Sequence, residues 1–271
     1  MKESTPSAHA RRLSRPTAPG AAVILACEMI EDEVLLALKR TGRTTPLVWI
    51  PAGLHERPAE LRAYLQDLVD RLDEGHANGT VVAVPSVRPG KGPVEPRAER
   101  VAVPPADEVL LALGYCGNGL QGLVSRRARL VFPRVDDCIS LFLNHGCTRE
   151  EICRDAHAFY FTRGWLCHDN PMLISYDAWR KRFGVEKARR LRKASMAAYR
   201  RITLIDTGAY SLEEFRPETE SLAADLELDH TVVPGSIGLL ERLFAGPWDS
   251  EVVVLPPGQE ISIRHLFGPE F

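Results

Sequence analysis

The sequence predicts an α/β fold, and three observations favour it. Short apolar runs such as 23–27 and 109–116 have the near-continuous hydrophobicity of parallel strands that are covered on both faces. Runs with helical spacing alternate with these strands along the chain. Several strands end in proline, whose missing N–H costs little at a strand end. We therefore expect three related Rossmann-like α/β units in a pseudo-threefold arrangement around a central site.

Each unit is expected to contain a strand, a helix, a second strand that ends in proline, and another helix. The three units cover residues 22–74, 108–170 and 171–262. Strands are expected at 23–27, 47–51, 109–116, 130–133, 202–206 and 231–234. Helices are expected at 58–72, 139–143 and 237–243. Because ligands bind beyond the carboxyl ends of parallel strands, side chains that follow these strands are candidates for the central site.

Four segments lie outside this plan. Residues 1–21 are rich in Ser, Pro, Arg and Ala and are expected to form a disordered tail, and 263–271 a second tail. The Pro/Gly-rich segment 75–107 is expected to be an insertion, either a loose hairpin or a lid. Residues 177–201 carry ten Lys and Arg against two acids and are expected to be helical. Such a run is typical of a solvated helix face, and also of a surface that attracts an anionic partner.

Charge and hydropathy exclude several classes of protein. A chain of 271 residues with a net charge of −2 is not typical of general nucleic-acid binders. No apolar stretch approaches the roughly 18 residues that a membrane-spanning helix needs. Six cysteines without a secretory signal indicate reduced thiols and hence a cytoplasmic protein. We expect a small-molecule substrate of anionic character and no membrane or nucleic-acid partner, and a homo-oligomer is compatible with the sequence.

Three cysteines each follow an apolar run at the point where it ends: Cys27, Cys116 and Cys138. Because the carboxyl ends of parallel strands meet at one edge of a sheet, these side chains can converge despite their separation in sequence. Three thiolates would suit a zinc ion or an iron–sulfur cluster that keeps one coordination position open for a substrate. The alternative is that the cysteines are simply packed, because free cysteine is among the most buried residue types.

Three candidate catalytic residues lie at or just beyond expected strand ends. His55 could complete a zinc site or act as a general acid or base, although a histidine before a helix is also a common cap or surface residue. Asp137 and Asp206 could orient ligands or transfer protons, and either could instead be the N-cap of a helix.

Four further residues are candidates for substrate binding. Asn118 lies between two glycines, in a loop that could present backbone N–H groups to an anion or be an ordinary turn. Thr207 follows Asp206, and Ser236 follows the Pro-Gly pair at the end of the last expected strand. Trp165 could form a pocket wall or pack between units.

Several of these residues belong to motifs that resemble an uncharacterised family, the domain of unknown function numbered 1638. The similarity extends from residue 22 to about 262. The matching motifs are Ala26-Cys27-Glu28 with Glu33, Leu54–Pro58, Gly114–Gly119, Pro133–Ile139, Tyr160 with Gly164-Trp165, Ile205–Gly208, Pro234-Gly235, Gly246 with Trp248, and Pro257-Gly258. Cys27, Cys116 and Cys138 fall on the family's cysteine positions, whereas Cys147, Cys153 and Cys167 do not.

The resemblance implies a metal centre held by the first three cysteines, and members of the family often accompany corrinoid-dependent methyl-transfer systems. The chain departs from the family pattern at Asp136, where histidine is usual, at Ser236, where an acid is usual, and in its longer insertion at 75–107.

From these features we expect a metalloenzyme. A 4Fe–4S cluster with an open iron would act as a Lewis acid on a small anionic or sulfur-containing substrate, in a lyase or transferase reaction. Two alternatives remain: a zinc–thiolate protein in methyl or sulfur transfer, and a non-catalytic metal-binding accessory of a corrinoid methyltransferase system.

Overall fold

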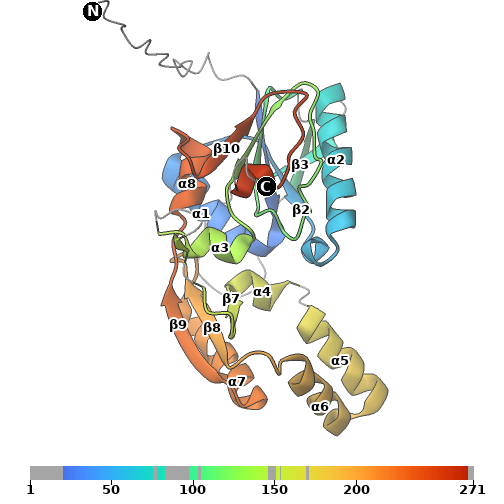
Figure 1. Ribbon diagram of the computed structural model, residues 1–271, viewed down its shortest axis with the longest axis vertical. Coiled ribbons are helices and arrows are strands. Elements are labelled where there is room, and N and C mark those ends of the chain that lie inside the picture. Colours follow the sequence, from blue (N-terminus) through green and yellow to red (C-terminus); the bar gives the residue numbers. More distant parts are fainter. Residues whose placement is uncertain are drawn as a thin grey trace, which may run out of the picture.

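The protein has an α/β fold in a computed structural model, which describes residues 21–75, 78–82, 98–102, 105–145, 151–152, 154–168 and 171–267. Within these residues the strands form a five-stranded sheet, a three-stranded sheet and a two-stranded ladder. The five-stranded sheet forms the first lobe and the three-stranded sheet belongs to the second lobe, which lies below the first in Figure 1. Of the tail expected at 1–21, only Ala21 is among the described residues. No helix in the described part of the chain is both long and apolar enough to cross a membrane.

The five-stranded sheet contains, in spatial order, β10 (Val252–Leu255), β6 (Arg129–Pro133), β5 (Glu108–Ala112), β1 (Ala22–Cys27) and β2 (Leu47–Ile50). All neighbours are parallel except β10, which closes one edge in the antiparallel direction. The central strands β1 and β5 are almost entirely buried. Their apolar sequences follow from this position, because helices cover both of their faces.

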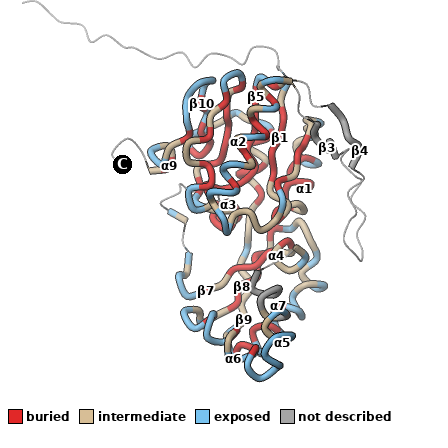
Figure 2. Tube along the Cα trace, turned by 90° about the vertical axis from the view of Figure 1, so that its right-hand side faces the viewer, coloured by how far each residue is buried: buried red, intermediate tan, exposed pale blue. Residues whose placement is uncertain are grey.

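Helices enclose this sheet from both sides (Figure 1), and its strands form the buried centre of the upper lobe (Figure 2). On one face lies α2 (Pro58–Glu74), which has proline in its first turn and ends at Gly75 in the left-handed conformation. Its buried residues recur with helical spacing: Leu61, Leu65, Leu68 and Leu72. On the other face lie α1 (Glu31–Thr41), α3 (Cys138–Leu143) and α8 (Gly238–Ala245).

The three-stranded sheet is parallel throughout and contains, in spatial order, β7 (Ala158–Phe161), β8 (Arg201–Asp206) and β9 (Asp229–Pro234). Helix α7 (Leu212–Leu226) packs its apolar side against this sheet. Helix α4 (Arg163–Cys167) follows β7 and contacts the 3-10 turn η1 (Glu28–Ile30) of the first lobe. Gly164 is required at this contact, because a Cβ there would lie 1.9 Å from the carbonyl oxygen of Met29.

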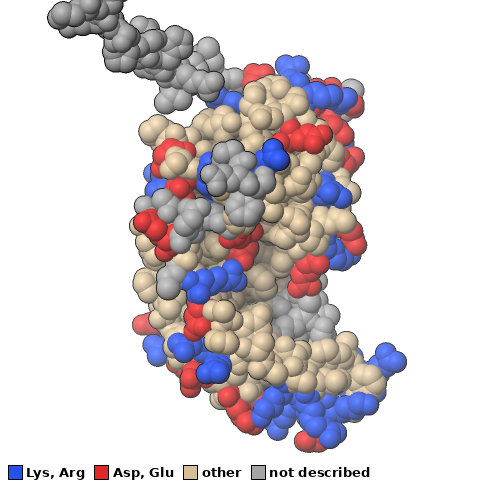
Figure 3. All heavy atoms as spheres, viewed as in Figure 1, with Lys and Arg blue, Asp and Glu red and all other residues tan. Residues whose placement is uncertain are grey.

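The basic segment 177–201 is largely helical, as the sequence predicts. Helices α5 (Pro171–Phe183) and α6 (Val185–Ser195) pack against each other at the lower end of the molecule (Figure 1). Lys and Arg side chains gather on this end (Figure 3). Part of this charge is paired, since Arg192 contacts Asp225 at 3.1 Å. The helical pair therefore presents a basic surface to solvent.

The expected pseudo-threefold arrangement is not confirmed. Strands of the first two expected units lie side by side in one sheet, because the apolar strands β1 and β5 pair directly with each other. Strand β10 and helix α8, both from the third expected unit, join this first lobe as well. Strand β7, from the second expected unit, instead pairs with β8. The described residues therefore form two lobes, and each lobe contains strands from more than one of the expected units.

Two of the segments outside the expected units are partly described. Within the insertion 75–107, β3 (Asn78–Val82) and β4 (Ala98–Ala102) pair in the antiparallel direction, as in the hairpin that the sequence allows there, and β3 contacts β2. The final segment 263–271, expected as a tail, contains the short helix α9 (Arg264–Phe267). Its Leu266 is buried in the core beside α2.

Candidate metal centre

The three cysteines follow three neighbouring strands of the five-stranded sheet. Cys27 is the last residue of β1, Cys116 lies in the loop after β5, and Cys138 is the first residue of α3, after β6. Because β6, β5 and β1 are adjacent and parallel, their carboxyl ends lie at the same edge of the sheet. The end of an apolar strand thus sets the position of each thiol.

Close backbone contacts hold the loops after β5 and β6 together. The N–H of Cys116 donates a hydrogen bond to the carbonyl oxygen of Asp136 at 2.8 Å. Gly114 leaves no room for a side chain, because a Cβ there would lie 2.4 Å from the Cα of Asp137. Cys116 itself has a φ of 48°, which is uncommon outside glycine. This local geometry places Cys116 beside the loop that leads to Cys138.

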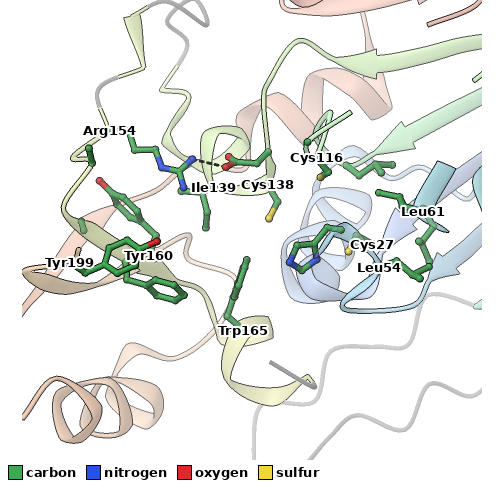
Figure 4. Close-up of a pocket in the computed structure, with 18 of the residues that line it drawn as sticks. Cys27, Leu54, Leu61, Cys116, Cys138, Ile139, Arg154, Tyr160, Trp165 and Tyr199 are labelled. Atoms are coloured by element: carbon green, nitrogen blue, oxygen red, sulfur yellow. Dashed lines mark hydrogen bonds and ion pairs between the residues drawn. The ribbon is translucent and has the colours of Figure 1, made fainter. Parts of the chain in front are cut away.

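A cavity of about 600 Å³ lies between the two lobes, and all three cysteines line it. They occupy the side formed by the five-stranded sheet (Figure 4). Residues of the second lobe form the opposite wall: Tyr160 from β7, Trp165 from α4, and Tyr199 from the segment before β8 (Figure 4). The cavity therefore joins the carboxyl edge of the first sheet to the second lobe.

Burial controls the protonation of the thiols. It raises the pKa of Cys27 to about 11 and also raises the pKa values of Cys116 and Cys138. The charges of Cys27 and Asp137 raise the pKa of Cys116 further, so these groups are close enough to interact. The nearby indole of Trp165 lowers the pKa of Cys138 and so partly opposes the shift. The free cysteines are therefore protonated at neutral pH, and a metal that binds them must release protons.

His55 lies at the same edge of the sheet, in the 3-10 turn η2 (Leu54–Glu56) after β2. It lines the cavity, and its ring centroid lies 5.3 Å from that of Trp165. Burial lowers its pKa, so the imidazole stays neutral at physiological pH. Its Nε2 is buried and has no hydrogen-bond partner among the described residues. Such a nitrogen is suited to bind a metal or to accept a proton from a ligand.

Asp137 also lines the cavity, and both of its oxygens have partners. Oδ1 accepts a hydrogen bond from the backbone N–H of Ser140 at 2.8 Å, which makes Asp137 the N-cap of α3. Oδ2 accepts from Nη1 of Arg154 in an ion pair at the cavity wall (Figure 4). The carboxylate therefore caps the helix that begins with Cys138 and also holds Arg154.

Asp206, Thr207 and Ser236 do not lie in the cysteine cavity. They line a separate crevice of about 380 Å³ at the carboxyl ends of β8 and β9. The Thr207 hydroxyl donates a hydrogen bond to the buried carboxylate of Glu33 at 2.9 Å. The Ser236 hydroxyl accepts one from the N–H of Gly238, at the start of α8. This placement separates the three residues from the thiols.

Asn118 lies outside both crevices. It is exposed and has a positive φ of 77°, a conformation that asparagine adopts more readily than most residues. Its carbonyl oxygen accepts a hydrogen bond from the N–H of Gln121 at 3.1 Å. This is the geometry of a turn, one of the two roles that the Gly-Asn-Gly pattern allows.

The donor set of the cavity consists of three thiols, with the buried Nε2 of His55 beside them. Among the described residues, no three or more His, Cys, Asp or Glu side chains are gathered tightly enough to enclose one metal ion. A zinc ion draws all its ligands to within about 2.3 Å of one centre, whereas a 4Fe–4S cluster binds each cysteine through a different iron. Thiols and an imidazole nitrogen are ligand types that both a zinc ion and an iron–sulfur cluster accept. Cys147 and Cys153 lie outside the described residues.

Arg154, Tyr160 and Tyr199 are among the cavity residues that were not identified from the sequence. Tyr160 belongs to a motif of the family resemblance, and this was the one available signal. All three come from the second lobe or the segment that leads into it, so only the docking of the lobes brings them to the cavity.

The fold and the cavity define an α/β protein with a thiol-lined cavity between two lobes. Residues 92–244 match the model of a family described as "Protein of unknown function (DUF1638)". The match covers more than half of the chain, and the protein belongs to this family. Comparisons with curated proteins and with solved structures gave no match. Cys116 and Cys138 lie within the matched residues, and Cys27 precedes them.

Proposed function

We propose that this protein is a metalloenzyme in which Cys27, Cys116 and Cys138 hold a 4Fe–4S cluster and leave one iron open to a substrate. The observation that carries the proposal is that three thiols, from the carboxyl ends of three adjacent parallel strands, line one cavity. This edge of a parallel sheet is where α/β proteins bind ligands. The open iron would supply Lewis-acid chemistry to a lyase or transferase reaction.

The side chains around the thiols have properties that suit a substrate cavity. His55, kept neutral by burial, can accept a proton from a bound ligand. Trp165 lies close enough to Cys138 to lower the pKa of that thiol. Asp137 holds Arg154, whose positive charge favours an anionic substrate. Asp206 lies in the other crevice, and we assign it no role at the thiols.

The proposal also requires a reducing compartment, which we take to be the cytoplasm. Cys27, Cys116, Cys138 and Cys167 are free thiols. Thiols stay reduced in the cytoplasm, where disulfides are rare.

The test is the visible spectrum of protein that is prepared without oxygen and reconstituted with iron and sulfide. We expect a brown protein that bleaches in air and whose spectrum changes when cyanide or a small carboxylate is added. Colourless protein that contains zinc would instead support the zinc–thiolate alternative. A coloured protein that responds to no small ligand would support the non-catalytic accessory. Protein that takes up no metal would contradict all three.

A further inference from the structure

The cavity has a second group of polar side chains besides the thiols and His55. Here Arg154, Tyr160 and Tyr199 lie together, across the cavity from the cysteines (Figure 4). The guanidinium carbon of Arg154 lies 5.5 Å from the centroid of the Tyr160 ring. Between the two groups the lining includes Ile139 and Trp165. Asp137, which pairs with Arg154 and directly precedes Cys138, links this end of the cavity to the thiols.

We infer that Arg154 binds the carboxylate of the substrate, and that the substrate is a carboxylate with a flat, apolar body whose other end reaches the thiols. This inference rests on the proposed function for the reaction at the thiol end. The binding of the carboxylate depends on the second lobe and can be measured without any metal.

Arg154 is well placed to bind an anion. Its Nη1 donates to Asp137, which fixes the guanidinium, and Nε and Nη2 are further donors on the same planar group. Two parallel N–H donors match the two oxygens of a carboxylate. The neighbouring acid, Asp155, is engaged elsewhere: it pairs with Arg201 at 3.2 Å and accepts a hydrogen bond from the N–H of His157 at 2.8 Å. Arg154 therefore has one acidic partner, Asp137, while Asp155 pairs with a different arginine.

Aromatic rings form a rigid wall beside Arg154. Phe159 packs edge-on against Trp165, with 6.2 Å between ring centroids, and against Tyr199, with 5.0 Å. Rings that hold one another in this way present preformed flat surfaces, and a planar ligand gains contact area there at little entropic cost. A small inorganic anion would leave this wall uncovered. The cavity therefore favours a carboxylate that carries a flat body.

The test compares benzoate with benzamide, which share a flat ring and differ in charge. Binding is measured by isothermal titration to cluster-loaded and to metal-free protein. We expect benzoate to bind, and benzamide and acetate to bind much more weakly. Arg154→Gln should weaken benzoate binding about ten- to hundredfold, because a charge-assisted hydrogen-bond pair is lost, and leave benzamide unchanged. Arg154→Lys keeps the positive charge but lacks the two parallel N–H donors. Its affinity for benzoate should lie between those of wild type and Arg154→Gln.

Arg126→Gln is the matched control, since this arginine is exposed and does not line the cavity. It should bind benzoate as the wild type does. Absence of benzoate binding to the wild type would overturn the inference. So would equal benzoate affinity in wild type and in the two Arg154 variants, with folding checked by thermal unfolding.

The two preparations separate this inference from the proposed function. Arg154-dependent benzoate binding by a protein that never takes up a cluster would support the inference and contradict the proposed function. A protein that holds a cluster but binds benzoate independently of Arg154 would support the proposed function and contradict the inference.

Discussion

Each cysteine of the cavity makes a separate prediction. Replacing Cys27, Cys116 or Cys138 by Ser keeps the size of the side chain but removes a soft thiolate ligand. Each variant should therefore lose most of its bound metal and unfold at a lower temperature than the metal-loaded wild type. Cys167→Ser is the control, because this cysteine is exposed and lies outside the cavity. The metal content of each variant is measured by elemental analysis. Full metal content in all three variants would mean that these cysteines are merely packed.

Glu33 is another residue whose chemistry is set by the fold. Its side chain is 1% exposed, and its Oε1 accepts a hydrogen bond from Thr207. Its Oε2 is buried without a hydrogen-bond partner in the described part of the chain. Burial raises the pKa of Glu33 to about 8, so the carboxyl group is mostly protonated at neutral pH.

Glu33→Gln tests this burial through the pH dependence of stability. The folded pKa of about 8 lies above the ordinary 4.5, so the stabilising contribution of the proton is complete below pH 4.5 and is lost as the pH rises through 8. Glutamine mimics the neutral acid. The variant should match wild type in urea unfolding at pH 4 and exceed it by about 2 to 4 kcal/mol at pH 9. The same pH dependence in wild type, in Glu33→Gln and in the exposed control Glu60→Gln would contradict the assignment.

At the scale of elements, apolar patterns located strands and helices but not their partners. β1, β2, β5, β6, β8 and β9 all overlap the segments that the sequence predicts, and α2 begins at the predicted Pro58. β7 and β10 have four residues each and gave no separate signal. The pairing of β1 with β5 joins residues far apart in the chain, and local periodicity carries no information about such contacts.

The contact between the loops after β5 and β6 makes a prediction at the same scale. Gly114→Ala would push a methyl group against the Asp137 backbone, 2.4 Å away. We expect a loss of at least about 2 kcal/mol of stability and a reduced metal content, because the loops of Cys116 and Cys138 must separate. Gly238→Ala is the control, since its Cβ meets the rotatable Ser236 hydroxyl at 3.1 Å. Chemical unfolding and metal analysis that give wild-type values for Gly114→Ala would contradict the prediction.

At the scale of the whole molecule, the cavity belongs to neither lobe alone. One core cluster extends from the first sheet into the second lobe, with Tyr160 and Ile205 packed among first-lobe residues. The thiols and His55 could be predicted because each follows an apolar strand of one sheet. Asp206 follows the same kind of strand, but its strand lies in the other sheet, so the assumption of a common centre misplaced it. Arg154 could not be predicted, because its position depends on how the lobes dock.

The content of iron and acid-labile sulfide per chain tests the central claim most directly. It is measured on wild-type protein and on Cys116→Ser, both reconstituted without oxygen and both shown to be folded by circular dichroism. We expect about four of each per wild-type chain and a small fraction of that in the variant. A folded wild-type chain that holds neither iron nor sulfide, or a Cys116→Ser chain that holds as much of both as wild type, would contradict the claim.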